Sequence, residues 1–411
     1  MTSRINLIAN PFYKGNGTKS YVHLLRKYGF NPTKEGPFFH GGSTATRRVL
    51  LKKRGSEVGE VEAEDVQNDS MYLAPVKIGT PSQTVELDFD TGSSDLWVWS
   101  TELPSSILHG PGSHSIFDSS KSSTFHESPS LTWRISYGDS SSASGNVGTD
   151  VVNVGGLVIE DQAVELATSM SRSFVSNAGD GLLGLAFGKI NTVKPERVKT
   201  LVENMIIQED IPKSAELFTV YLTSSKDLEQ SFYTFGFIDD AIVRDSGQEI
   251  SYAPVDNGSG FWMFDSTSAT INGNPIHRLG NKAIADTGTT LALVDDKTCN
   301  AIYSAVPGAT YDSGSQGYIF PNDLNPQDLP TITFAVGDRQ FPVRKSDLGF
   351  AEARPGYVFG GIQSRGDLSF DILGDTFLKA IYAIFDVGNL RFGAVEKNIS
   401  GLSHDLKSEL K

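Results

Sequence analysis

Two short motifs in this sequence could carry acid–base chemistry. Asp90-Thr91-Gly92-Ser93 and Asp286-Thr287-Gly288-Thr289 each follow an apolar stretch and precede another one. A single Asp-Thr-Gly is weak evidence, because an ordinary turn has the same composition. Two copies with equivalent flanks indicate instead that one structural unit occurs twice and presents one aspartate per copy.

A second pair of markers supports this duplication. Asp180-Gly181-Leu182-Leu183-Gly184 matches Asp371-Ile372-Leu373-Gly374. The spacing from the motif aspartate to the last glycine of the marker is 94 residues in the first copy and 88 in the second. The sequence therefore predicts two equivalent lobes and not an array of repeats.

Two aspartates that meet between such lobes would share one proton. Two like charges ~3 Å apart cannot both ionise at low cost, so the pair titrates as a unit. The ionised carboxylate can act as a base on a water molecule, while the protonated one hydrogen-bonds a substrate carbonyl. Asp90 and Asp286 are therefore the candidate catalytic residues for amide hydrolysis without a metal or a covalent intermediate.

The residues beside the two aspartates fit the same role. Gly92 and Gly288 permit close backbone approach, so that main-chain N–H groups can reach the carboxylates. Ser93 and Thr289 place a hydroxyl three residues after each aspartate, within range of its outer oxygen. The alternative for all four residues is ordinary turn chemistry.

The elements that must position these motifs are mostly short strands. Runs of β-forming residues, mostly bounded by turn residues, predict strands at 72–78, 84–89, 131–137, 147–154, 218–222, 232–237, 283–285, 291–294, 331–336 and 380–385. The best helix candidates in the body are 198–207 and 297–306. The 41 glycines, 24 phenylalanines and 13 tyrosines also favour an all-β protein.

Composition excludes several classes of protein. No uninterrupted apolar run approaches the ~20 residues of a membrane helix, so no membrane association is expected. Cys299 is the only cysteine, which excludes a disulfide scaffold and a cysteine-ligated metal site. The seven histidines show no ligand-like spacing, so neither a metal nor another cofactor is expected.

The charge is unevenly distributed along the chain. Residues 1–54 hold eleven basic side chains and one acidic one, a net charge of +10, which leaves −24 for the remainder of a chain whose total is −14. A basic arm suits nucleic acid, but the acidic body would repel the phosphates, so no nucleic-acid partner is expected. The arm should instead dock on the body and be released by cleavage at the basic cluster 52–54. A solvated charge run without processing is the alternative.

The arm and its surroundings carry further signals. Tyr21, Leu24, Leu25 and Tyr28 predict one apolar helix face. The first ten residues lack the apolar core of a signal peptide. Four Asn-x-Ser/Thr sequons are nevertheless compatible with secretion and glycosylation, namely those at Asn16, Asn68, Asn257 and Asn398. Secretion is expected, with a vacuolar location as the alternative.

Together these motifs resemble those of the pepsin-like aspartic endopeptidases, most closely the fungal penicillopepsin and aspergillopepsin subgroup. The likeness extends from about Tyr72 to Phe392 and includes 95–104, 133–139 and 142–147. It implies a bilobal fold of two pseudo-two-fold-related, β-barrel-like lobes with the active cleft between them. It also implies an acid-acting, monomeric enzyme with protein and peptide substrates.

The resemblance assigns further site residues. The tip of a flap that closes over bound peptide would be formed by Tyr137, Gly138, Asp139 and Ser140, and a hairpin turn is expected there. Three side chains would line substrate subsites, namely Phe174, Leu183 and Thr290. In the fungal subgroup a flap Asp followed by Ser is associated with Lys before the cleaved bond. The enzyme is therefore expected to accept Lys there as well as large apolar residues.

The resemblance also accounts for the basic arm. Family zymogens carry a basic pro-segment in which the Lys of a Lys-Tyr pair points at the catalytic aspartates, and Lys27-Tyr28 matches that pattern. The expected organisation is a pro-segment over 1–54 that inhibits its own enzyme, an N-terminal lobe over 55–235 and a C-terminal lobe over 236–411. Release would follow acid protonation of the carboxylates, or cleavage after the basic cluster by another protease.

The sequence departs from the resemblance at one point and disfavours two alternative functions. Related fungal enzymes often have one disulfide in the second lobe, but the corresponding positions here are Asn322 and Val358. A catalytically silent relative would usually lack an aspartate or its neighbouring glycine, and both are present. A carboxylate-pair glycosidase would need an acid and a base on unrelated flanks, which the duplicated motif disfavours.

Overall fold

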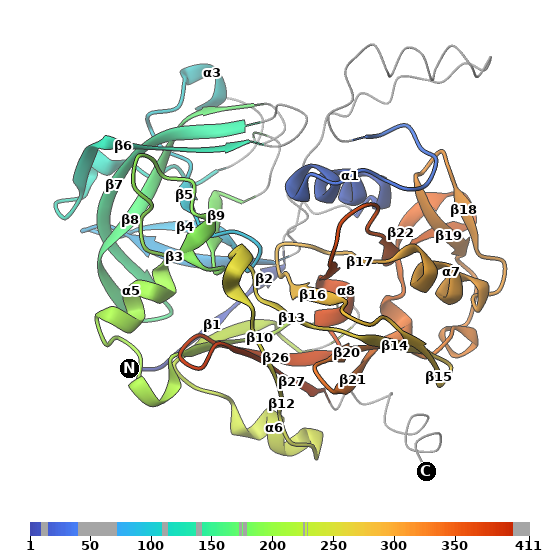
Figure 1. Ribbon diagram of the computed structural model, residues 1–411. Helices are drawn as coiled ribbons and strands as arrows, with labels where there is room; N and C mark the ends of the chain where they lie inside the picture. The colour runs from blue at the N-terminus through green and yellow to red at the C-terminus, as the bar shows by residue number, and fades with distance from the viewer. Residues whose placement is uncertain are drawn as a thin grey trace.

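The computed structural model describes residues 1–9, 15–39, 72–108, 114–136, 142–171, 175, 179–224, 227 and 229–397 of the 411-residue chain. These residues form mostly strands, arranged as two lobes above a shared sheet, with helix α1 (Gly17–Tyr28) lying on the second lobe, on the side that faces the first (Figure 1). The predicted all-β, bilobal fold is confirmed.

The first lobe is a closed β-barrel. Its sheet runs in the order β2-β3-β4-β9-β5-β8-β7-β6, and an additional pairing of β3 with β7 closes it. The strands are β2 (Ile8–Ala9), β3 (Tyr72–Ile78), β4 (Gln83–Asp90), β5 (Leu96–Val98), β6 (His126–Ser136), β7 (Ser142–Val154), β8 (Leu157–Met170) and β9 (Gly181–Gly184). Inward-facing residues such as Val76, Val85 and Leu87 are almost completely buried, as the alternation of side chains along a strand requires.

The second lobe consists of three smaller sheets. The five-stranded sheet is β13 (Met263–Asp265), β16 (Lys282–Ala285), β25 (Asp371–Leu373), β17 (Ala292–Val294) and β24 (Ile362–Ser364). One four-stranded sheet is β15 (Asn274–His277), β14 (Ser268–Ile271), β20 (Ile332–Val336) and β21 (Arg339–Val343). The other is β18 (Thr310–Asp312), β19 (Gly317–Pro321), β23 (Tyr357–Gly360) and β22 (Gly349–Arg354).

A six-stranded sheet underlies both lobes. Its order is β1 (Ser3–Asn6), β11 (Phe232–Phe235), β10 (Leu217–Tyr221), β26 (Ile381–Asp386), β27 (Arg391–Glu396) and β12 (Ser251–Pro254). Phe218 and Phe385 stack at 4.7 Å between ring centroids in its core. Strand β1 belongs to the basic arm, and it pairs antiparallel with β11 while Ile5 enters the core. The start of the arm therefore contributes a strand to the sheet of the body. The sequence predicted that the arm docks on the body, but it did not indicate this strand.

Helices are short and few among the described residues. Besides α1 they are α3 (Ser105–Leu108), α5 (Leu201–Ile207), α6 (Asp240–Ser246), α7 (Asp296–Ser304) and α8 (Asp375–Leu378). Single 3₁₀ turns are η1 (Ser119–Lys121), η2 (Gly188–Ile190), η3 (Lys213–Ala215), η4 (Asn257–Ser259), η5 (Pro326–Asp328) and η6 (Lys345–Asp347). None of the described helices has both the length and the apolar character needed to cross a membrane.

Helix α1 has clear start and stop signals. The side chain of Asn16 accepts a hydrogen bond from the Lys19 N–H at 3.0 Å, and Gly29 ends the helix in the left-handed region at φ 66°. Tyr21, Leu24 and Leu25 are buried against the second lobe, which confirms the predicted apolar face.

The duplicated motifs occupy equivalent places in the two lobes. Strand β4 runs parallel to β9 with Asp90 opposite Gly184, and β16 runs parallel to β25 with Ala285 opposite Leu373. The next pair in the second register would be Asp286 and Gly374. The predicted structural repeat is thus present in the strand pairing itself.

Buried charge holds the second lobe together beside its aspartate. The carboxylate of Asp371 is fully buried and accepts hydrogen bonds from Arg278, from Arg365 at 2.6 Å and from Asn281 at 3.0 Å. Replacing Asp371 with Ala would leave the buried Arg278 guanidinium with only its longer ion pair, to Asp295 at 3.6 Å, and we expect a loss of about 3–5 kcal/mol in the free energy of unfolding. Denaturant titration measures this, with the exposed Asp265→Ala as control. Equal stability of the two variants would contradict it.

Candidate active site

The two motif aspartates meet between the lobes. Asp90 ends β4 and Asp286 follows β16, and both side chains are almost fully buried. The N–H of Gly92 donates to Asp90 Oδ1 at 2.7 Å, and the N–H of Gly288 donates to Asp286 Oδ1 at 3.0 Å. The two carboxyl groups lie within hydrogen-bonding reach of each other. The arrangement is the one that a shared proton requires.

A reciprocal pair of threonines fixes this meeting of the lobes. The N–H of Thr91 donates to the Thr287 hydroxyl at 3.1 Å, and the N–H of Thr287 donates to the Thr91 hydroxyl at 3.0 Å. Each hydroxyl also donates to a carbonyl of the opposite lobe, Thr91 to Ala285 at 2.9 Å and Thr287 to Phe89 at 2.7 Å. Sequence reasoning missed this function, although the threonine present in both motifs was the available signal.

The glycines of the two motifs make room for the opposite carboxylate. A Cβ atom on Gly92 would collide with Asp286, and one on Gly288 would collide with Asp90. The predicted need for close backbone approach is therefore confirmed, and its cause is the aspartate of the other lobe.

The two hydroxyl positions differ between the lobes. The Thr289 hydroxyl donates to Asp286 Oδ2, as predicted. The Ser93 hydroxyl is buried beside Asp90 and lowers the pKa of that carboxyl, but its geometry is poorer than that of the Thr289 contact. On the Asp90 side, both carboxylate oxygens instead receive hydrogen bonds from Lys27.

The environment separates the acidities of the two carboxyl groups. Burial raises the pKa of Asp90 to about 6, assisted by the charge of Asp286 and opposed by that of Lys27. Burial acts in the same direction on Asp286. There it is outweighed by the Lys27 ammonium and by hydrogen bonds from Asp90, Thr289 and Tyr28, which bring the pKa to about 2. Between these values the pair holds one proton.

Lys27 and Tyr28 of the basic arm occupy this site. Lys27 Nζ lies 3.0 and 3.1 Å from the oxygens of Asp90, and 3.1 and 3.4 Å from those of Asp286. The Tyr28 hydroxyl donates to Asp286 Oδ2 at 2.5 Å, while its ring packs near Phe261 and Phe370. The end of α1 therefore places a cation and a phenol directly against the two carboxyl groups.

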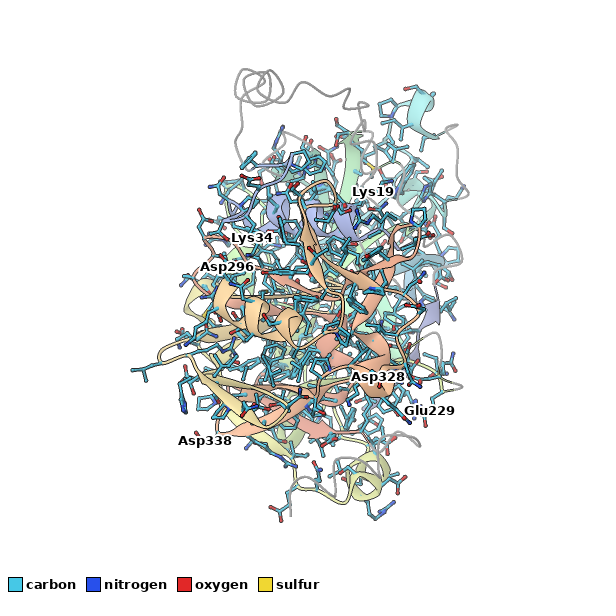
Figure 2. All side chains as sticks on the ribbon, turned by 90° about the vertical axis from the view of Figure 1, so that its right-hand side faces the viewer. Lys19, Lys34, Glu229, Asp296, Asp328 and Asp338 are labelled. Atoms are coloured by element: carbon cyan, nitrogen blue, oxygen red, sulfur yellow. The ribbon has the colours of Figure 1, made fainter. Side chains whose placement is uncertain are left out.

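The arm continues along the rim of the second lobe. Asn31 donates its N–H to Asp367 at 2.7 Å, and the Thr33 hydroxyl donates to Asp296 at 2.6 Å. Lys34 lies near Asp296 (Figure 2), and its ammonium sits 5.1 Å from the centre of the Tyr318 ring. Acidic side chains of the body thus hold the basic arm beyond its contact with the aspartates.

Several predicted site residues lie outside the described part of the chain. These are Tyr137, Gly138, Asp139, Ser140 and Phe174. Leu183 is fully buried in the core of the first lobe. Thr290 is buried as well, and its carbonyl accepts hydrogen bonds from Thr376. Cys299 is a buried free thiol, and no metal-binding cluster occurs among the residues that the structure describes.

Comparison with known proteins links this geometry to one family. A family model described as eukaryotic aspartyl protease matches residues 71–397. Aspergillopepsin-1 of Aspergillus oryzae is 39% identical over 86% of this chain and 86% of its own length. Endothiapepsin of Cryphonectria parasitica is 38% identical over 92% and 86%, and penicillopepsin-1 of Talaromyces stipitatus is 40% identical over 84% and 83%.

Proposed function

This chain belongs to the eukaryotic aspartyl protease family, and from that premise we propose that it is a zymogen whose Asp90 and Asp286 together hydrolyse peptide bonds. Its activity as an aspartic endopeptidase follows from the family. The observation that carries the finer proposal is the contact of Lys27 with both carboxylates, at 3.0 to 3.4 Å.

In the proposed mechanism the chain's own residues hold and move one proton. One carboxylate takes a proton from a bound water while the protonated partner hydrogen-bonds the scissile carbonyl. The donors to the carboxylates, including the N–H groups of Gly92 and Gly288, hold each carboxylate plane in a fixed orientation. The cross-lobe threonine contacts keep the two carboxyl groups at a constant separation, so little reorganisation is needed during the reaction.

In the proposed zymogen the arm inhibits the enzyme by occupying the active site. Lys27 takes the position between the two carboxylates, and Tyr28 donates to Asp286. Strands β1 and β2 secure the same arm by pairing with β11 and β3 of the body. We therefore propose a division of the chain by function. Residues 1–54 are the removable inhibitor, and residues 55–235 and 236–411 are the two lobes of the enzyme.

The experiment that tests this function follows mass and activity together. Purified full-length protein is held at about pH 3–4 with a denatured protein substrate. Loss of an N-terminal piece of about 54 residues, together with peptide-bond cleavage, is expected. An intact and inert chain is next cut at the arm with a Lys/Arg-specific protease. Continued inactivity would then refute the proposed catalytic role.

We further propose that the enzyme accepts Lys as well as large apolar residues before the cleaved bond. The basis is the Asp139-Ser140 pair in the sequence, since a carboxylate can pair with a substrate ammonium. Asp139→Ala is expected to lower kcat/KM for a Lys-directed peptide by roughly 10–100-fold relative to a matched Phe-directed peptide. An unchanged ratio between the two peptides would rule out this role.

Two broader properties belong to the same proposal. The enzyme is proposed to be secreted, with a vacuolar location as the alternative, and to act as a monomer on protein and peptide substrates. The sequons at Asn16 and Asn257 then become candidate glycosylation sites, and Asn16 would leave with the arm.

A further inference from the structure

A second pair of carboxyl groups is buried directly behind the Asp90 loop. Asp95 lies five residues after Asp90, and Glu165 lies on β8 opposite Trp97 of β5. Their exposed fractions are only 2% and 1%. The proposed mechanism uses neither group, so their burial needs another explanation.

The hydrogen bonds around the pair are unequal. Asp95 Oδ1 accepts from the Thr192 N–H at 2.8 Å, from the Thr192 hydroxyl at 2.9 Å and from Asn191 Nδ2 at 3.1 Å. Glu165 Oε1 accepts only from Asn191 Nδ2, at 3.3 Å, and Glu165 Oε2 is buried without a donor among the described residues. The protein thus supplies Asp95 with the hydrogen-bond donors that stabilise a carboxylate anion, whereas Glu165 lacks them.

A proton on Glu165 resolves this imbalance. Both carboxyl groups contact the same amide nitrogen, that of Asn191, at 3.1 and 3.3 Å, and a protonated Glu165 can donate to Asp95. Burial, followed by the charge of Asp95, holds the pKa of Glu165 well above its ordinary value. Burial also raises the pKa of Asp95. Loss of the proton would leave two adjacent buried anions.

The surroundings offer no counter-charge to a doubly ionised pair. Glu165 faces Trp97 of β5 and Val147 of β7, and Asp95 faces the neutral Asn191 and Thr192 of the loop after η2. Within the described residues, no Lys, Arg or His forms a salt bridge with either carboxyl group. When the second carboxyl group ionises, the structure around the pair must therefore open locally so that water can solvate the charge.

The second lobe provides an internal comparison. Strand β17 pairs with β24 as β5 pairs with β8, which places Gln363 opposite Leu293 as Glu165 is opposite Trp97. Gln363 is equally buried and is fully paired, through hydrogen bonds with Tyr318 and Gly360 at 2.8 to 3.0 Å. The residue five positions after Asp286 is Leu291. The repeated architecture therefore does not require acids at these two places.

The acidic pair is connected to the catalytic loop. Asn191, which contacts both carboxyl groups, also donates to the Ser94 carbonyl at 3.2 Å, and Gly184 donates its N–H to the Asp95 carbonyl at 2.8 Å. Ser94 lies four residues after Asp90. Movement of Asn191 or Asp95 would thus displace the end of the loop that carries Asp90.

We propose that the Asp95–Glu165 pair keeps the first lobe, and with it the Asp90 loop, stable only while the pair holds a proton. Glu165 is then a positioning residue, and the enzyme is confined to acid by a group outside its catalytic pair. A group protonated more readily in the folded state contributes stability below its unfolded pKa, and loses it as pH rises through the folded value. The lobe should therefore weaken as the medium approaches neutrality.

The test replaces Glu165 with Gln, the residue that the second lobe uses. Thermal unfolding of the full chain is followed between pH 5 and 8.5 by fluorescence, since Trp97, Trp99 and Trp133 of the four tryptophans lie in the first lobe. At pH 5 the midpoints of variant and wild type should agree within about 2 °C. At pH 7.5 the midpoint of E165Q should be higher by about 5 °C or more, because the wild-type pair then loses its proton.

The control is Glu127→Gln, which makes the same charge change at an exposed position on β6 of the same barrel. If E165Q follows E127Q and the wild type at every pH, the proposal is wrong. If E165Q does not fold at pH 5, Asp95→Asn is measured instead and should show the same gain. Failure of both amide variants to fold would also overturn it, because a neutral pair would then be insufficient.

An activity measurement separates positioning from stability alone. Protein with the arm removed is held at pH 7.5 and returned to pH 4 for assay. We expect E165Q to retain at least about threefold more activity than the wild type. Equal losses would contradict the effect on the Asp90 loop. Only this measurement rests on the proposed role of Asp90, since unfolding is observed without catalysis.

Discussion

Replacing Asp286 with Asn is expected to lower peptide-bond hydrolysis by at least about 10³-fold, because an amide can neither take a proton from water nor share one with Asp90. The fold should persist, since the Asn oxygen can still accept from the Gly288 N–H, which lies 3.0 Å from the present carboxylate. Activity of the arm-free protein at pH 4 and its circular dichroism spectrum are the two measurements.

The matched control is Asp265→Asn, which removes one carboxylate from an exposed position in the same lobe. It should retain the full rate. Asp90→Asn should behave as Asp286→Asn does, and the double variant should lose little more than either single one, because the pair acts as a unit. An Asp286→Asn protein with more than a tenth of the wild-type rate would show that the reaction does not need this carboxylate.

The sequence was sufficient for those parts of the site that depend on short-range pattern. Both aspartates and their glycines follow from the repeated motif, and the strand register confirms their equivalence. Lys27 and Tyr28 follow from the resemblance, and both side chains contact the aspartates.

Features that depend on contacts between distant segments were not predictable. Strand β1 carries four residues without a distinctive pattern, and it becomes a strand because the edge of β11 is open to it. Glu165 is an ordinary residue in an alternating strand, and its burial beside Asp95 appears only when the barrel closes.

Release of the arm gives the second large expected effect, and its pH dependence follows from the same contacts. The Lys27 ammonium lowers the pKa of both Asp90 and Asp286, so docking of the arm favours the ionised pair. For Asp286 this contribution is present above the ordinary aspartate pKa of about 4 and is lost as pH falls towards about 2. Acid therefore weakens the docked state.

Lys27→Met should consequently make the arm leave more easily. The variant keeps the length of the side chain but removes a cation whose exposed fraction is only 8% and which contacts both carboxylates. Losing one partner of a buried ion pair costs about 3–5 kcal/mol. The Tyr28 hydrogen bond and the β1 pairing would still hold the arm in place. We therefore expect only part of the lost free energy to weaken docking of the arm. We expect the full chain to hydrolyse peptide at pH 5.5 at least about 10-fold faster than the wild-type full chain.

Lys19→Met is the matched control, because it removes a lysine from an exposed position on the same helix, as labelled in Figure 2. Intact mass recorded during each assay distinguishes opening of the arm from its cleavage. In Lys27→Met the pH at which half of the arm is lost should move upward by at least about one unit, since the ammonium no longer holds the carboxylates ionised. An unchanged midpoint, together with an inert full chain at pH 5.5, would mean that Tyr28 and the strand pairing inhibit without Lys27. The acid sensitivity of the proposed zymogen would then have to reside in the carboxylates along the rim, Asp296 and Asp367, which bind Thr33 and Asn31.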